Sequence, residues 1–221
     1  MEKQVIILLG KSGSGKGTQA ELLKEKLGFA HVVSGDLLRA RAKKTDFTGK
    51  KLADVLKNGG LAPMAVIFKL WLDRIERLFN KKSTKGFILD GNPRRINEAY
   101  LIDEVFGWYD IKNLKVVLID ISDEDAIFRM GKRKLCSNKK CGNIIPFNDE
   151  TKDLLKCPKC GRKLIARNDD RDPGAVSKRL EWFKTDVQPI VDYYKETGRL
   201  HVIDGIGTID EIFNRVQESI K

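Results

Sequence analysis

Residues 10–18, Gly-Lys-Ser-Gly-Ser-Gly-Lys-Gly-Thr, are the strongest candidates for chemistry in this sequence. Their glycines let backbone N–H groups turn toward an anion with no Cβ atom in the way. Lys16 adds a point charge that can reach the β and γ phosphates of a nucleotide. The apolar run 5–9 predicts a buried parallel strand, and 19–27 predicts a helix. A strand, a glycine loop and a helix in this order predict a phosphate-binding loop.

A carboxylate and two arginines follow another apolar run, Gly86–Leu89, which predicts a second strand of the same sheet. Asp90 would end this strand, where it can hold Mg²⁺ through the water shell of the ion. Arg94 and Arg95 come next, at the sheet edge where open α/β sheets bind ligands. The planar guanidinium fork suits phosphate, and this favours Arg94 as a phosphate ligand. For Arg95 an exposed basic turn is an equal alternative.

Four cysteines fall within one short window, in the pattern Cys136-x4-Cys141-x15-Cys157-x2-Cys160. Two such pairs predict a tetrahedral structural Zn²⁺ site rather than a disulfide framework. Gly142 and Gly161 each follow the second cysteine of a pair, where a thiolate-binding turn needs a positive φ. Reduced metal-free thiols are one alternative, and iron is another because four thiolates also suit it.

Strands are predicted at 5–9, 29–33, 86–91, 114–121 and 200–204, with helices near 49–57, 122–132, 174–197 and 209–220 and one opened by Pro63. Ser34 and Asp36 are candidate caps for a helix after the second strand, and Pro189 is expected to kink the long helix. The two histidines, His31 and His201, are interpreted as packed strand residues rather than bases. The alternation predicts a three-layer α/β fold with a five-stranded parallel sheet.

The composition restricts the function classes. The sequence has 221 residues, 41% hydrophobic and 33% charged, with a net charge of +11. This predicts one globular core with room for small inserts. A membrane-spanning run and a signal peptide are not found, so we expect a cytoplasmic protein with no membrane partner. The positive charge fits nucleotides, nucleic acid or a solvated basic surface, and does not decide among them.

Several blocks together resemble one family, the adenylate kinases, in the long form with a zinc-bearing lid. They are Gly13–Thr18, Ser34–Arg39, Leu89–Arg94 and the cysteine segment, and the match extends over almost the whole chain. The resemblance implies a P-loop core formed by residues 1–32, 63–131 and 171–221. It also implies a monophosphate-binding subdomain at 33–62 and a lid at 132–170.

The resemblance further implies site residues. On the ATP side these are Gly13, Ser14, Gly15, Lys16, Gly17, Thr18, Arg129, Arg133, Ile144, Ile145 and Gly207. On the AMP side they are Ser34, Arg39, Gly60, Leu61, Ala62, Gly91, Arg94, Glu98, Arg167 and Arg179. Residues with catalytic roles would be Lys16, Asp90, Arg94, Arg133, Arg167 and Arg179, and Asp169 and Asp170 would lie at the lid hinge.

The implied activity is Mg²⁺-dependent transfer of the ATP γ-phosphoryl group to AMP, which gives two ADP, by a monomer with no nucleic-acid partner. Such a transfer needs positioning and charge neutralisation rather than a nucleophile or a base. Three positions depart from the family pattern: Ser34 replaces Thr, Asn92 replaces Phe, and Glu98 replaces the Gln that recognises adenine. A kinase for another nucleoside monophosphate is therefore an alternative. A non-catalytic zinc-ribbon protein that binds nucleic acid is a second one, although residues 132–166 offer only Phe147 for base stacking.

Overall fold

The computed structural model describes residues 3–58, 60–81, 83–138, 140–148, 151–166, 170 and 172–221. Its main sheet is parallel, with the strand order β2-β3-β1-β4-β8. The strands are β1 (Gln4–Leu9), β2 (Ala30–Val33), β3 (Gly86–Asp90), β4 (Leu114–Asp120) and β8 (Leu200–Asp204). The predicted five-stranded parallel sheet is thereby confirmed.

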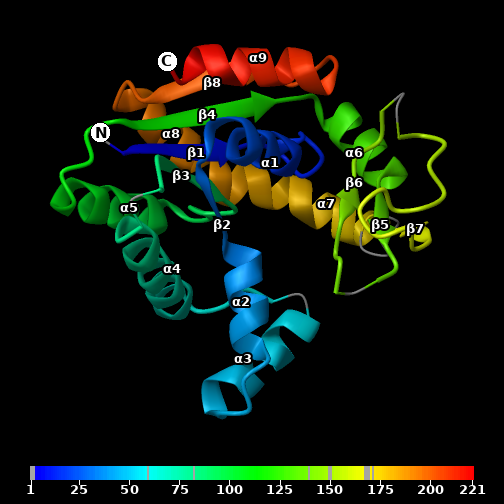
Figure 1. The fold of residues 1–221 in the computed structure, drawn as a ribbon, viewed down its shortest axis with the longest axis horizontal. Helices are drawn as coiled ribbons and strands as arrows, with labels where there is room; N and C mark the ends of the chain where they lie inside the picture. Colours follow the sequence, from blue (N-terminus) through cyan, green and yellow to red (C-terminus); the bar gives the residue numbers. More distant parts are fainter. Residues whose placement is uncertain are drawn as a thin grey trace.

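Helices cover both faces of this sheet, because its strands are apolar on both sides. Within β1, Val5, Ile7 and Leu9 face one layer while Ile6 and Leu8 face the other. The first layer contains α4 (Met64–Phe79), α5 (Ile96–Trp108) and α8 (Gln188–Glu196). The second contains α1 (Lys16–Leu27) and α9 (Ile209–Ser219). The result is the three-layer arrangement expected from the sequence (Figure 1).

Two segments project from the three-layer core. Helices α2 (Ser34–Ala42) and α3 (Phe47–Lys57) extend below the sheet in Figure 1 and share a small apolar cluster with α4. Strands β5 (Lys134–Cys136), β6 (Ile144–Ile145) and β7 (Leu164–Ala166) form a separate antiparallel sheet in the order β6-β5-β7. This small sheet follows α6 (Asp123–Lys132) and lies at the right of Figure 1.

Several element boundaries differ from the prediction. Helix α1 begins at Lys16 rather than Gln19, because Gly15 in the left-handed region already serves as its N-cap. Helix α3 begins at Phe47 rather than Gly49, since the Asp46 side chain caps it by accepting from Gly49 N. The expected caps Ser34 and Asp36 are wrong: α2 begins at Ser34, and its N-cap is Val33, which makes no side-chain bond.

The long helix predicted over 174–197 is divided into three parts. Helix α7 (Pro173–Trp182) continues into the π-helical turn η2 (Phe183–Val187) and then into α8. Pro189 lies just after this turn and has no N–H to donate to the preceding turn, so the interruption falls where the sequence placed a kink. Helix α5 was not predicted individually. It begins directly after the turn Asn92-Pro93-Arg94-Arg95, and its N-cap, Arg95, makes no side-chain capping bond.

Among the described residues, every helix is too short or too polar to cross a lipid bilayer.

Candidate active site

The phosphate-binding loop connects β1 to α1, as predicted. Gly10 has a φ of 144°, and a Cβ atom there would lie 2.5 Å from the Ile119 carbonyl oxygen, so the loop can pass this close to β4 only with glycine. Gly15 is required for another reason. No atom of the described residues lies within 4 Å of its Cβ position, but its φ of 97° is strained for any other residue. These two glycines fix the curvature of the loop.

Lys16 is held inside the loop. Its Nζ atom donates to the carbonyl oxygens of Gly10, at 2.6 Å, and Lys11, at 2.8 Å. Burial lowers the pKa of the Lys16 ammonium to about 8; the Asp90 carboxylate opposes this decrease, and Arg133 and Arg94 add to it. The charges that act on Lys16 therefore come from β3, from the turn after β3 and from the end of α6.

Lys11 is a loop residue whose role the sequence did not indicate. Its Nζ atom donates to Ile121 O at 2.7 Å and pairs with Asp123 at 2.8 Å. Asp123 also pairs with Lys184, at 3.1 Å. Lys11 thus ties the phosphate loop to the first turn of α6, the helix that precedes the small antiparallel sheet.

Asp90 ends β3 beside the phosphate loop. A Cβ atom added at Gly17 would lie 3.8 Å from Asp90 Oδ2, so this carboxylate faces the first turn of α1. Burial raises the pKa of Asp90, but contacts with His31 and the charges of Lys16 and Arg94 outweigh it and hold the pKa below its usual value. Asp90 is consequently ionised at neutral pH, as a Mg²⁺ ligand must be.

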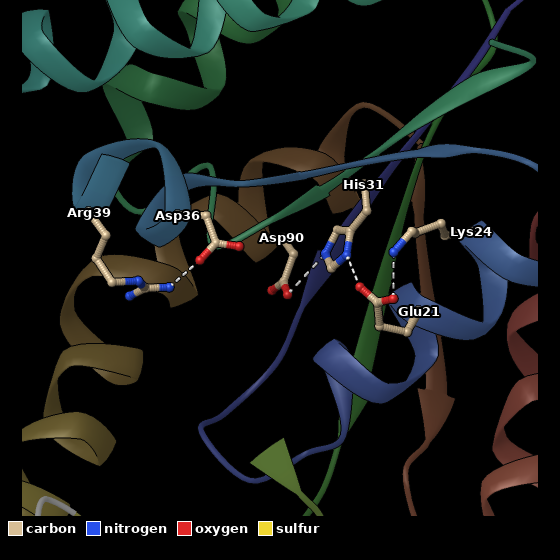
Figure 2. A network of polar contacts seen from close by, with 6 residues as sticks. All are labelled: Glu21, Lys24, His31, Asp36, Arg39 and Asp90. Carbon is tan, nitrogen blue, oxygen red and sulfur yellow. Dashed lines mark hydrogen bonds and ion pairs between the residues drawn. The ribbon is translucent and has the colours of Figure 1, made fainter. Parts of the chain in front are cut away.

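His31 lies between two carboxylates (Figure 2). Its Nδ1 atom is 2.9 Å from Glu21 Oε1, and its Nε2 atom is 3.4 Å from Asp90 Oδ2. Burial lowers the pKa of His31, yet the two carboxylates outweigh this effect and raise it above 6.5. Glu21 in turn pairs with Lys24 at 2.7 Å. The prediction of a packed strand histidine omitted these contacts, because neither partner is near His31 in sequence.

The phosphate loop is one candidate ligand site, and a cavity between α2, the 60–62 segment, α4 and the start of α5 is another. We call it the second cavity. The residues that line it are Ser34, Leu38, Leu61, Ala62, Ile67, Asn92, Arg94, Arg95 and Glu98. Five predicted AMP-site residues, Ser34, Leu61, Ala62, Arg94 and Glu98, are therefore together. Arg39 is outside this set: it is exposed and pairs with Asp36 at 2.6 Å (Figure 2).

Arg94 is held in place in the wall of this cavity. Its Nε atom donates to Gly91 O at 3.0 Å, and its guanidinium lies 5.7 Å from the centre of the Trp182 ring. Gly91 and Gly60, the other predicted AMP-site glycines, lie directly after β3 and after α3. Asn92 was not among the predicted site residues and entered only as a departure from the family pattern; in the structure the residue is 3% exposed and lines the same cavity.

Two of the arginines that were predicted to have catalytic roles meet on one buried carboxylate. Arg133, after α6, and Arg179, in α7, both donate to Asp170, and the Arg133 Nη2 to Asp170 Oδ1 distance is 2.6 Å. Arg167 and Asp169 lie outside the described residues. Arg129 donates to Gly205 O at 2.9 Å, which places it next to the loop that contains Gly207.

The four cysteines converge in the small sheet. Their Sγ atoms all lie within 4.8 Å of one another; Cys136 and Cys160 are 3.3 Å apart, and Cys141 and Cys157 are 3.9 Å apart. Four thiolates around a tetrahedral Zn²⁺ are about 3.8 Å apart, so the donor set fits this ion. Gly142 and Gly161 have φ values of 60° and 69°, and the predicted positive φ is confirmed at both.

The lid residues that were predicted to touch nucleotide differ in exposure. Ile144 is exposed, whereas Ile145 packs with Cys136, Cys157 and Leu164 in the small core of the lid. A side-chain contact with a nucleotide is therefore available to Ile144 and not to Ile145. The remaining predicted residues of the ATP side, Gly13, Ser14 and Thr18, lie in the phosphate loop and the first turn of α1.

Comparison with known families agrees with the phosphate loop and the sheet described above. The adenylate kinase family model matches residues 8–199 of this chain. The chain belongs to the adenylate kinase family. It is 39% identical over 215 residues to the adenylate kinase of Ruminiclostridium cellulolyticum, covering 97% of this chain and 98% of that protein.

Two further adenylate kinases match almost the whole chain. The protein of Syntrophobacter fumaroxidans is 36% identical over 211 residues, with 96% of this chain and 97% of the relative covered. The protein of Methanothrix thermoacetophila is 35% identical over 215 residues, with 96% of each chain covered. The family match therefore includes the phosphate loop, the second cavity and the cysteine segment.

Proposed function

We propose that this chain catalyses reversible, Mg²⁺-dependent transfer of the γ-phosphoryl group of ATP to AMP, which yields two ADP. One observation carries the proposal. The phosphate loop follows β1 and the cavity with Arg94 follows β3, and these strands are neighbours that pair Leu8 with Asp90. Two sites suited to phosphates therefore lie side by side at one edge of the sheet, as transfer between two nucleotides requires.

In this mechanism the side chains supply charge and position. Lys16 neutralises the β and γ phosphates, and Arg94 holds the monophosphate in line with the γ phosphorus. Arg133, Arg167 and Arg179 place positive charge around the phosphoryl group as it is transferred. Mg²⁺ bound with ATP would screen the phosphate oxygens, with Asp90 as its water-mediated ligand. A general base is not needed, and both histidines stay outside the reaction.

The other site assignments belong to the same proposal. ATP would contact the side chains of Arg129 and Ile144, and the backbone of Ile145, of Gly207 and of the segment from Gly13 to Thr18. AMP would contact Ser34, Arg39, Gly91, Glu98 and the segment Gly60-Leu61-Ala62. We further propose that residues 33–62 and 132–170 move as units over a core formed by 1–32, 63–131 and 171–221. The protein would act as a cytoplasmic monomer.

Zn²⁺ at Cys136, Cys141, Cys157 and Cys160 would be structural. Four thiolates fill a tetrahedral shell and leave no open position for substrate. The lid core contains few apolar side chains besides the cysteines, chiefly Ile145, Leu164 and Leu154. A core of this size gives little stability alone, so the metal supplies the rest.

The decisive experiment measures ADP formation from Mg-ATP with AMP, GMP, CMP or UMP. AMP should support strong turnover. Arg94→Ala should lower kcat/KM for AMP about 100-fold or more, since it removes a charged donor. Arg77→Ala, which removes an exposed arginine on α4, is the matched control and should leave turnover unchanged. Turnover with another monophosphate would show that AMP is not the substrate and keep the kinase assignment. Turnover with none, together with salt-dependent nucleic-acid retention, would favour a non-catalytic protein that binds nucleic acid.

A further inference from the structure

The second cavity has oxygen atoms in its wall that lack partners. Ser34 Oγ and Asn92 Oδ1 are buried and accept no hydrogen bond from any described group; the two residues are only 1% and 3% exposed. Glu98, 6% exposed, lines the same cavity. Buried polar atoms are nearly always paired, so unpaired acceptors that line a cavity indicate a ligand with hydrogen-bond donors.

Glu98 is held in a fixed orientation. It lies in the first turn of α5, and its Oε2 atom accepts from the backbone N–H of Arg94 at 2.7 Å. One carboxyl oxygen is thereby occupied by the protein, and the other is left for the cavity. The remaining walls are Leu38, Leu61, Ala62 and Ile67, which suit the faces of a planar ring.

The edge of adenine offers two groups to such a wall. Its exocyclic amino group donates, and its ring N1 atom accepts. Asn92 Oδ1 provides an acceptor for the amino group. An ionised Glu98 would place a second acceptor against N1, and two acceptors repel each other. A carboxylic acid at Glu98 would instead donate its proton to N1.

We propose that Glu98 recognises AMP as a neutral carboxylic acid, which donates to N1 while Asn92 accepts from the exocyclic amino group. This rests on the proposed function, because it assigns the cavity to the base of AMP. The proton comes from solvent, remains on Glu98 while AMP is bound, and returns to solvent when an ionised Glu98 is restored. AMP binding is therefore linked to the uptake of one proton.

The electrostatic environment of Glu98 agrees with this role. Burial raises the pKa of the Glu98 carboxyl, and the backbone N–H of Arg94 and the charges of Arg94 and Arg95 oppose the increase without cancelling it. The charge of Arg39, on α2, contributes to lowering the pKa of Arg94. The described residues that line the cavity from α2, the 60–62 segment and α4 are uncharged.

Glu98→Gln tests the proposal, because an amide supplies permanently the donor that the acid supplies only when protonated. We would measure the Kd and KM for AMP from about pH 5.5 to about pH 8.5 in both proteins. The wild-type affinity should fall by up to about tenfold per pH unit once pH exceeds the Glu98 pKa. The variant should lack this slope and bind AMP more tightly at high pH. Titration of the AMP phosphate affects both proteins equally and cancels in the comparison.

Asn92→Ala tests the second contact. It should weaken AMP about three- to tenfold, as loss of one hydrogen bond does, and leave purine riboside monophosphate, which has no amino group, unaffected. Equal weakening of both nucleotides would show a merely structural role for Asn92 and overturn its assignment.

The outcomes separate this inference from the proposed function. If the wild type makes ADP from AMP and both proteins share one pH profile, Glu98 recognition is wrong and the kinase assignment stands. A wild-type preference for GMP over AMP throughout this pH range would also overturn the inference, since it would mean that Glu98 stays ionised and accepts from the N–H groups of guanine. If no monophosphate supports turnover or binds, both proposals fail.

Discussion

At the scale of single residues, His31 shows how one side chain can order a site without touching substrate. It holds Asp90 from one side, and Glu21 holds His31 from the other. Because the folded state raises the His31 pKa, it binds a proton more tightly than the unfolded chain, whose histidine titrates near 6.5. The resulting stabilisation is complete below about pH 6.5 and is lost as pH rises through the folded-state pKa.

His31→Asn should therefore lower the free energy of unfolding by about 1–2 kcal/mol near pH 6 and by less near pH 8.5. Urea denaturation at the two pH values checks this. His201→Asn is the matched control: burial and Lys115 lower the pKa of His201, so its effect on stability should have the opposite pH dependence. A pH-independent difference at His31 would mean that the ring acts by packing alone.

Lys16 predicts a second pH effect, on ATP rather than on folding. Its pKa of about 8 means that the free enzyme loses this charge above about pH 8. The KM for ATP should then rise with pH, by up to about tenfold per unit, because the phosphates bind the ammonium form. Lys11 is the internal comparison, since it is paired with Asp123, and Lys11→Gln should leave this slope in place. A flat profile for ATP in the wild type would contradict the prediction.

At the scale of elements, α9 has a complete capping box. The Thr208 side chain accepts from Glu211 N, and the Glu211 side chain accepts from Thr208 N at 2.8 Å. Thr208→Ala should cost about 1 kcal/mol of unfolding free energy, and Thr208→Ser, which keeps the hydroxyl, should cost much less. Chemical denaturation measures both. Equal losses would assign the effect to the methyl group instead.

The elements also show where sequence reasoning succeeds. The strand at 5–9, the phosphate loop and the cysteine turns were predictable, because local patterning and glycine chemistry fix them. The His31 pair with Asp90, the Lys11 pair with Asp123 and the π-helical turn before Pro189 were not. Each depends on how distant segments pack, which one sequence does not specify. From the sequence, Asn92 is only a departure from the family pattern. Its burial in the wall of the second cavity is what indicates a contact with ligand.

At the scale of the whole molecule, the cysteine-bearing segment that we propose as the lid has an apolar cluster of its own. The cluster around Cys136, Ile145, Cys157 and Leu164 shares no member with the clusters of the main sheet. Removal of the metal by a chelator and a thiol reagent should unfold the lid and leave the core intact. Hydrogen exchange should then accelerate at Leu135 and Leu164 but not at Ile7 or Val117. Phosphoryl transfer should fall at the same time, and uniform acceleration in all strands would contradict this independence.

The strand order has a consequence for the growing chain. Strand β1 is central, yet it is made first of the described strands, and its partners β3 and β4 begin only at Gly86 and Leu114. Until Leu114 and its neighbours leave the ribosome, this apolar strand keeps at least one unpaired edge, the edge that β4 pairs with in the folded protein. A nascent chain that stalls between β3 and β4 should therefore depend on chaperones. A chain released after β8 is complete should not depend on them.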